Sequence, residues 1–290
     1  MEKAFDPWNR KEDIVDTVYQ GLNYKIKDKS KENFKGKKRC IIFFSSNDLW
    51  YPNTESVFRE AIIKKDRYEW ENISNNSVDR EIYVRDIYKS WYVTGINKNV
   101  DSVDKLLTLL KKYTAGYVVT TIGISAGGYM AIIIGCLLNA EYVISFSPQT
   151  DLTYSEINNN SFLKKYSKDH NKNKYYRVYD VVCKSKTPIY YIVGNKSKAD
   201  AFYLAECKKM PHFKTIIFAS KKHGAIVERS ALKRMISLSL EEWDEIYISN
   251  MGKLINPVMF SMEMAGIIPT ISDIFGRMKR GIVKLKRKFL

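Results

Sequence analysis

Hydrophobic residues in this chain form short runs that alternate with longer segments of helical period. The runs are rich in β-branched and aromatic residues, which predicts buried strands at 39–46, 81–87, 117–122, 142–146, 188–193 and 215–219. Helical periodicity predicts helices around 103–110, 129–138, 199–209 and 225–247. Such an alternation predicts an α/β fold, a mostly parallel twisted sheet with helices on both faces, whose ligands bind at the carboxyl ends of the strands.

Most of the chain is expected to form one domain. It has 290 residues, of which 45% are hydrophobic, enough for one sizeable core, so intrinsic disorder is excluded. We expect an α/β domain over 1–250. Within it, residues 151–186 are rich in Asn, Lys and Tyr and form either a lid insert near the ligand crevice or a solvated loop. Residues 251–290, which hold five of the nine methionines, form a separate C-terminal segment.

Cysteine usage and the N-terminus favour the cytoplasm. The four cysteines are scattered, with no close pair that would suggest a metal clip or a redox dithiol. The first residues lack the apolar core of a signal peptide. We therefore expect a reduced, cytoplasmic setting and no bound metal.

The uncharged stretch 113–140 contains the motif that carries chemistry. Gly123-Ile124-Ser125-Ala126-Gly127 fits Gly-x-Ser-x-Gly and lies between a β-branched run and an apolar helix. A serine on such a sharp turn has a strained backbone, and larger side chains two residues away would collide with it. We expect Ser125 to be a nucleophile and the Ala126 N–H to be one donor of an oxyanion hole. The alternative is an ordinary glycine-rich turn.

A serine nucleophile needs a histidine base and a carboxylate, in the chain order Ser, Asp or Glu, His. His223 follows the strand at 215–219 and so lies at a carboxyl end, whereas His170 and His212 are expected on the surface. Asp200, beyond the strand at 188–193, is the first choice for the acid. Asp151, after the strand at 142–146, is its competitor.

A second oxyanion donor is expected on the loop after an earlier strand. Ser45-Ser46-Asn47-Asp48 follows the strand at 39–46, so the N–H of Ser46 or its neighbour is the candidate. An ordinary polar turn is the alternative.

From about residue 14 to residue 247 the chain resembles the α/β-hydrolase superfamily. More narrowly, residues 123–131 and 144–150 are similar to hydrolase-type proteins encoded with bacterial capsule and other surface-polysaccharide enzymes. Trp91-Tyr92 resembles an aromatic pair in those proteins, and the resemblance implies that Trp91, Tyr92 and Gln149 bind substrate. Asp200 departs from the pattern, because the acid usually lies closer to the glycine that ends its strand than Asp200 lies to Gly194.

This resemblance implies a serine O-acyltransferase or esterase that acts on a carbohydrate in bacterial surface-polysaccharide biosynthesis. Some such relatives use acetyl-CoA, so acetyl-CoA is the expected acyl donor and no cofactor stays bound. The alternative is a non-catalytic hydrolase-like scaffold in a polysaccharide-assembly complex.

The formal net charge is +16, and much of the surplus lies at the C-terminus. Pro257 and Pro269 are expected to break any single long helix, so no membrane span is predicted. Between Ile274 and Leu290, a basic amphipathic helix is predicted, with an apolar stripe at Ile274, Met278, Ile282, Leu285 and Phe289. Such a helix is typical of peripheral binding to an anionic membrane surface. Docking on its own domain or on a homodimer partner is an equal alternative, and nucleic acid ranks third.

Overall fold

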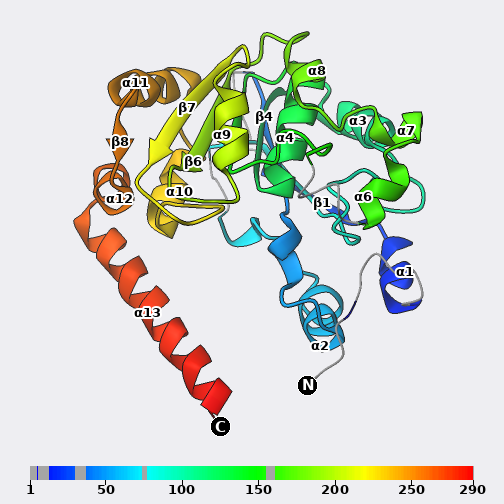
Figure 1. Ribbon diagram of the computed structural model, residues 1–290, viewed down its shortest axis with the longest axis horizontal. Helices are drawn as coiled ribbons and strands as arrows, with labels where there is room; N and C mark the ends of the chain where they lie inside the picture. The colour runs from blue at the N-terminus through cyan, green and yellow to red at the C-terminus, as the bar shows by residue number, and fades with distance from the viewer. Residues whose placement is uncertain (1–4, 6–12, 30–36, 74–76, 155–160, 290) are drawn as a thin grey trace.

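The computed structural model describes residues 5, 13–29, 37–73, 77–154 and 161–289. Its centre is an eight-stranded sheet in the order β1-β3-β2-β4-β5-β6-β7-β8 (Figure 1). Only the β1–β3 pair is antiparallel among the paired strands of the described chain. The predicted fold class, a mostly parallel sheet covered by helices, is confirmed. In chain order the strands are β1 Tyr24–Asp28, β2 Arg39–Phe44, β3 Arg80–Val84, β4 Val118–Ile124, β5 Tyr142–Phe146, β6 Ile189–Gly194, β7 Phe213–Phe218 and β8 Leu254–Ile255.

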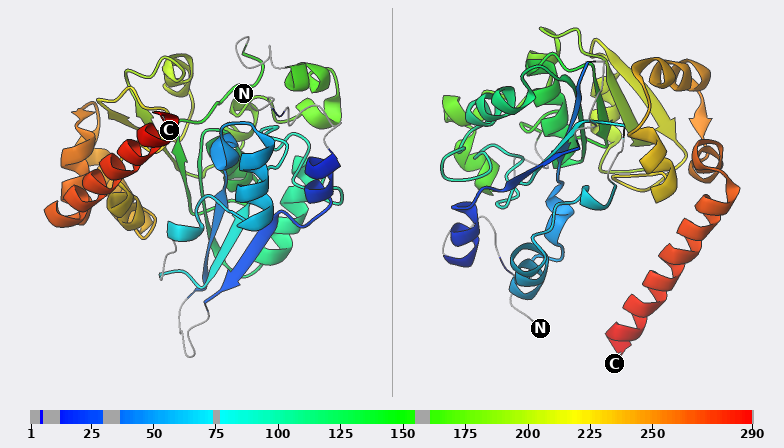
Figure 2. Two further views of the ribbon diagram at one scale, coloured as in Figure 1. Left: turned by 90° about the horizontal axis from the view of Figure 1, so that it is seen from below. Right: turned by 180° about the vertical axis from the view of Figure 1, so that it is seen from behind.

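Helices cover both faces of the sheet (Figures 1 and 2). On one face lie α3 Val103–Thr114, α4 Ala126–Leu137, α8 Tyr179–Val182 and α9 Ala201–Cys207, and on the other lie α10 Arg229–Met235, α11 Leu240–Asn250 and α12 Pro257–Ala265. Alternate residues of the strands point to opposite faces: in β6, Tyr190 and Ile192 join one buried cluster, while Tyr191 and Val193 join another. Both faces of the central strands are therefore buried, as their continuous hydrophobic runs require.

Shorter elements surround this sandwich. They are α1 Asp13–Tyr19, η1 Asn47–Trp50, α2 Glu55–Phe58, η2 Arg59–Lys64, η3 Glu71–Ile73, α6 Ser161–Tyr166 and α7 His170–Asn173. Within the insert at 151–186, Tyr175, Tyr176 and Val182 are buried in the cluster that contains α4. Much of the insert is thus packed against the sheet domain, and its role as a lid stays a prediction.

The predicted helix over 225–247 is wrong, because two helices, α10 and α11, occupy this range. Ser239 begins α11 with a capping box: its hydroxyl accepts from the N–H of Glu242, whose carboxylate accepts from the N–H of Ser239. This local exchange satisfies the first turn of a new helix and ends the periodic run.

Residues after 250 first add β8 to the edge of the sheet and then form α12 and α13 Ile267–Phe289. The sheet therefore takes strands from both sides of the predicted boundary at 250. The segment is not a single long helix, as expected from its prolines: Pro257 begins α12, and Pro269 lies in the first turn of α13, where a missing N–H costs no helical hydrogen bond. No helix of the described chain is both long enough and apolar enough to cross a membrane.

Candidate active site

Ser125 lies on the sharp turn between β4 and α4. Its backbone has φ 54° and ψ −120°, a conformation that costs a non-glycine residue energy and is retained only where the surroundings hold it. The Ser125 N–H donates to the carbonyl of Phe146 on the neighbouring strand at 2.8 Å. A Cβ at Gly127 would lie 2.3 Å from the carbonyl oxygen of Phe44, and one at Gly123 would lie 2.1 Å from that of Gly127. The glycines of the motif are therefore required by close backbone approach.

His223 and Asp200 complete a chain of hydrogen bonds that begins at Ser125. The Ser125 Oγ lies 2.9 Å from Nε2 of His223, and Nδ1 of His223 lies 2.7 Å from Oδ1 of Asp200. The three residues come from the carboxyl ends of β4, β7 and β6, which are brought together although His223 is 98 positions from Ser125. With Nδ1–H donating to Asp200, Nε2 is free to accept the serine proton.

Asp200, rather than the competitor Asp151, faces the histidine. The Asp200 side chain is 1% exposed, and its Oδ2 has no hydrogen-bond partner within the described chain. Asp151 instead accepts from the N–H of Thr153 at 2.8 Å and lies 3.9 Å from the Arg177 guanidinium. The structure therefore excludes Asp151 as the orienting acid in this conformation. The hydrogen bond from Nδ1 to the buried carboxylate orients the imidazole with Nε2 toward Ser125.

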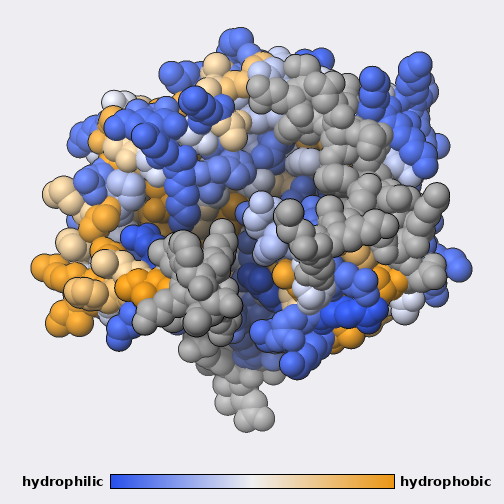
Figure 3. All heavy atoms as spheres, turned by 60° about the horizontal axis from the view of Figure 1, so that its bottom comes forward, coloured by the Kyte–Doolittle hydropathy of each residue, from blue (hydrophilic) through white to orange (hydrophobic). Residues whose placement is uncertain are grey.

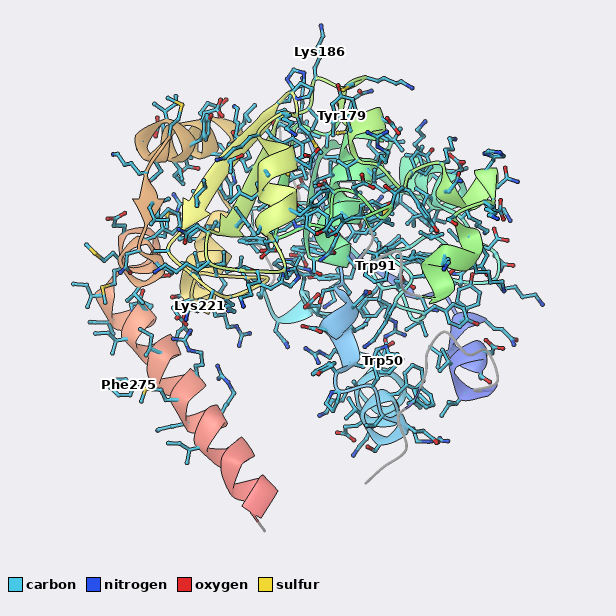
Figure 4. The ribbon with its side chains drawn as sticks, in the orientation of Figure 1. Trp50, Trp91, Tyr179, Lys186, Lys221 and Phe275 are labelled. Carbon is cyan, nitrogen blue, oxygen red and sulfur yellow. The ribbon has the colours of Figure 1, made fainter. Side chains whose placement is uncertain are left out.

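Gln149 touches both Ser125 and His223. Its Nε2 lies 3.1 Å from Ser125 Oγ and 3.5 Å from His223 Nε2. Its Oε1 accepts from the indole N–H of Trp91 at 3.1 Å. Because an indole nitrogen can only donate, Trp91 fixes the amide so that the NH₂ group faces the serine. Ser125 Oγ then accepts a hydrogen bond from Gln149 and donates one to His223. Figure 4 shows Trp91 at this end of the sheet.

Tyr92, predicted to bind substrate, does not reach the site. Its side chain is fully buried in the core, and its hydroxyl donates to the carbonyl of Ser45 at 2.8 Å. The prediction for Tyr92 was wrong because neighbouring side chains of this loop point in different directions: Trp91 contacts Gln149, whereas Tyr92 points into the core. Through its hydrogen bond to Ser45, Tyr92 stabilises the loop that follows β2.

Ser46, predicted as an oxyanion donor, has its N–H occupied. It donates to Oε2 of Glu69 at 2.5 Å, and the Ser46 hydroxyl donates to Oε1 at 2.8 Å. Burial raises the pKa of the Glu69 carboxyl. The neighbour Asn47 begins η1, so its N–H has no partner within that helix, and the N–H of Ala126 is in the same position at the start of α4. Of Ser46 and its neighbour, the two candidates for the second donor, the structure leaves Asn47, and Ala126 stays the candidate for the first.

Asp86 stabilises the loop that carries Trp91, and the sequence analysis did not single it out. It lies after β3 and accepts from the N–H groups of Tyr88, Ser90 and Tyr92 at 3.1, 2.5 and 2.9 Å. These bonds shape the loop that carries Trp91. Asp86 lies inside the strand predicted over 81–87, which in the structure ends at Val84. A carboxylate that binds backbone amides leaves no motif in the sequence.

The two remaining histidines lie apart from this cluster. His170 begins α7, and His212 precedes β7 with φ 63°. Within the described residues, no group of three or more His, Cys, Asp or Glu side chains could hold a metal ion. Around the Ser125 hydroxyl the structure brings together an imidazole, a buried carboxylate and an amide donor.

Comparisons with known proteins support the fold. No protein-family model matches the chain, and no curated protein matches it. Among solved structures, a capsule O-acetyltransferase of Neisseria meningitidis serogroup A is 15% identical with a TM-score of 0.50, over 78% of this chain and 92% of that one. Est1E from Butyrivibrio proteoclasticus is 14% identical with a TM-score of 0.45, over 78% of this chain and 94% of that one. Pyrococcus horikoshii acylaminoacyl peptidase is 14% identical with a TM-score of 0.45, over 80% of this chain but only 40% of that one.

The similarity to the capsule O-acetyltransferase is low in sequence and concerns the fold. Together with the parallel strand order and the serine at the β4–α4 turn, it agrees with the fold expected from the sequence. The chain has the α/β-hydrolase fold.

Proposed function

We propose that this chain is a serine O-acyltransferase that moves an acyl group from acetyl-CoA to a hydroxyl of a carbohydrate. The observation that carries the proposal is the chain of hydrogen bonds from Ser125 Oγ through His223 to the buried Asp200. The setting we propose is the cytoplasmic assembly of a bacterial surface polysaccharide, and hydrolysis to water is the competing fate of the same acyl-enzyme.

The first half of the reaction acylates Ser125. As Oγ forms a bond to the carbonyl carbon of the thioester, His223 Nε2 accepts the serine proton, and the carbonyl π electrons move to the oxygen. The N–H groups of Ala126 and Asn47 stabilise that oxyanion. The carbon–sulfur bond then breaks, and the thiolate leaves as a thiol with the proton from His223.

The second half transfers the acyl group. A carbohydrate hydroxyl gives its proton to His223 Nε2 while its oxygen attacks the acyl-serine carbonyl. Collapse of the tetrahedral intermediate breaks the bond to Oγ, which recovers its proton from His223. Asp200 orients the imidazole through Nδ1 in both halves, and it stabilises the charged ring without being protonated.

Two similarities support a carbohydrate as the acceptor. The motifs at 123–131 and 144–150 resemble proteins encoded with polysaccharide enzymes. One structural neighbour is itself a capsule O-acetyltransferase. We propose that Trp91, which is partly exposed beside Gln149, contributes an apolar ring face to the binding of the sugar.

A fluorophosphonate probe tests the nucleophile directly, because it labels an activated serine. We expect labelling of the wild-type protein and none of Ser125→Ala. The matched control is Ser237→Ala, because Ser237 lines a cavity beside Arg39 and Cys40 at the opposite ends of the strands. Labelling that persists in Ser125→Ala would show that another residue reacts and would overturn the assignment of Ser125. A folded wild-type protein that is never labelled would favour the non-catalytic scaffold.

Incubation with acetyl-CoA and candidate oligosaccharides separates transfer from hydrolysis. Thiol release that depends on added oligosaccharide, with acetylated sugar detected by mass spectrometry, supports the transferase. Free acetate as the sole product, at a rate indifferent to the sugar, identifies an esterase.

A further inference from the structure

Exposed large hydrophobic side chains are concentrated near the C-terminus of the described chain. Of the fourteen that are exposed, ten lie between residues 248 and 282. Figure 3 shows hydrophobic side chains gathered on the side of the molecule where α12 and the start of α13 lie. The ten are Ile248, Met251, Leu254, Met259, Ile267, Ile268, Ile271, Phe275, Met278 and Ile282. Such a concentration is typical of an interaction surface.

Along α13 these residues form one stripe. Ile267, Ile271, Phe275, Met278 and Ile282 follow each other at spacings of three or four, the spacing of one helix face. The exposed stripe shares Met278 and Ile282 with the predicted one. It contains Phe275, which is exposed, in place of the predicted Ile274, which is half-buried. The side chains of Leu285 and Phe289, the rest of the predicted stripe, lie outside the described part of the chain.

The body of the protein holds α13 near its beginning and leaves the rest projecting. Oδ2 of Asp273 accepts from the N–H of Ser230 at 2.6 Å, and Arg277 pairs with Glu228 at 2.6 Å. Beyond this attachment the helix extends away from the sheet, as Figure 1 and the right panel of Figure 2 show. Phe275 lies on this projecting helix (Figure 4). A helix of 23 residues is about 35 Å long, long enough to lie along a planar surface.

The charge of the helix selects the kind of surface. Seven basic residues follow Asp273, and no acid does; they are Arg277, Lys279, Arg280, Lys284, Lys286, Arg287 and Lys288. Asp273, the one acid of α13, already accepts from Ser230. Pairing this helix with the same helix of a second copy would bring two sets of like charges together, which is unfavourable. An anionic surface would gain from both the apolar stripe and the basic residues.

We propose that α13 binds an anionic lipid membrane in the plane of its surface. The apolar stripe enters the boundary between headgroups and acyl chains, while the basic residues interact with anionic headgroups. The attachment to Glu228 and Ser230 joins α13 to the segment that follows His223, and Lys221 of the same loop lies between the sheet and α13 in Figure 4. Binding would therefore hold the His223 end of the sheet close to the bilayer.

Vesicle co-sedimentation of the full chain tests the proposal without any activity readout. The probes are vesicles of phosphatidylcholine alone and vesicles with about 30% phosphatidylglycerol. We expect partition into the anionic vesicles to exceed that into neutral ones at least tenfold and to weaken at high salt. The triple variant Phe275→Ser, Met278→Ser, Ile282→Ser should reduce it at least tenfold, since all three side chains are exposed and their loss leaves the core unchanged.

The matched control changes three exposed hydrophobic residues elsewhere: Leu22→Ser, Ile63→Ser and Tyr179→Ser. It should bind as the wild type does. A second variant, Lys279→Gln with Arg280→Gln, should weaken anionic binding about tenfold and leave neutral binding unchanged. Equal binding to both vesicle types, or an unchanged partition of the stripe variant, overturns the proposal. So does sedimentation velocity that shows a dimer dispersed by the stripe variant, because the stripe would then be covered by a second copy.

Discussion

The helices α4 and α13 differ in how far their hydrophobic side chains are buried. In α4 every residue from Ala126 to Cys136 is buried, because the sheet covers one side and α8 with its insert covers the other. In α13 the hydrophobic residues form a single stripe, and the described part of that stripe is exposed. A helix that is hydrophobic all round is buried by other parts of its own chain. An exposed hydrophobic stripe on an amphipathic helix indicates a binding partner outside the chain.

The difference extends to the polar groups around each helix. At the start of α4, hydrogen bonds link Ser125, His223, Asp200, Gln149 and Trp91 within the chain. On the described part of α13, Asp273 and Arg277 tie the N-terminal half of the helix to the body. The first region is thus organised for internal chemistry, and the second for contact with a surface. Changes in one should leave the other unaffected.

The largest effect is expected from His223→Ala. Without the base, Ser125 keeps its proton, and acyl-enzyme formation should fall by about 10⁴-fold or more. Thiol release from acetyl-CoA or hydrolysis of a chromogenic acetate ester measures this, with His212→Ala as the control. Vesicle binding should stay at the wild-type level, and a parallel loss of binding would mean that the two regions are not independent.

Gly127→Ala should unfold the first region more readily. The added Cβ would lie 2.3 Å from the backbone oxygen of Phe44, which cannot move without shifting β2. We expect the free energy of unfolding to fall by about 3 kcal/mol, the upper end of the usual range for overpacking of a core. Denaturation in urea measures it.

The matched change on the other helix is Gly276→Ala. Its Cβ would lie 3.5 Å from Nη1 of Arg280, an ordinary contact with the end of a flexible side chain. Helicity by circular dichroism should rise slightly, because alanine favours a helix by about 1 kcal/mol over glycine. If Gly127→Ala and Gly276→Ala lowered the free energy of unfolding equally, the contrast between the buried helix α4 and the exposed helix α13 would be contradicted.

Asp86→Asn tests a buried charge in the first region through pH. Burial raises the pKa of Asp86 to about 6 from an ordinary value of 3.8. The folded state therefore holds this proton more tightly, so the group's stabilising contribution is complete below pH 3.8 and is lost as the pH rises through 6. The wild type should lose about 2 kcal/mol relative to the variant between pH 4 and pH 7. Urea denaturation at both values gives the difference; a difference independent of pH would show that Asp86 titrates normally.

Trp91→Phe should have the smallest effect on catalysis. It removes the indole N–H that orients the Gln149 amide while retaining an aromatic ring. We expect kcat to fall about tenfold or less, near the value of one neutral hydrogen bond. A purely substrate-binding role for Trp91 would raise KM and leave kcat unchanged. Fluorophosphonate labelling rates give a second readout, because they report the reactivity of Ser125 without the sugar.

Several features of the fold and the candidate site were predicted from local sequence. Gly123 and Gly127 around Ser125, between a β-branched run and an apolar helix, predict a nucleophile turn because its backbone strain and close approach are local. Alternating strand and helix patterns predicted the parallel sheet. Since parallel strands bring their carboxyl ends to one edge, the position of His223 after β7 predicted its meeting with Ser125.

Other features depend on contacts between residues far apart in the chain, and only the tertiary structure decided them. Asp200 and Asp151 both follow strands, and only the packing of the loops shows that Asp200 faces His223. Ser46 is occupied by Glu69, and Tyr92 points into the core, because of neighbours that no local pattern encodes. The sequence by itself determined where reactive groups emerge from the sheet, since strand direction and turn chemistry are local properties. Which of those groups meet was decided by side-chain packing, because the distances that permit a hydrogen bond are set by the whole fold.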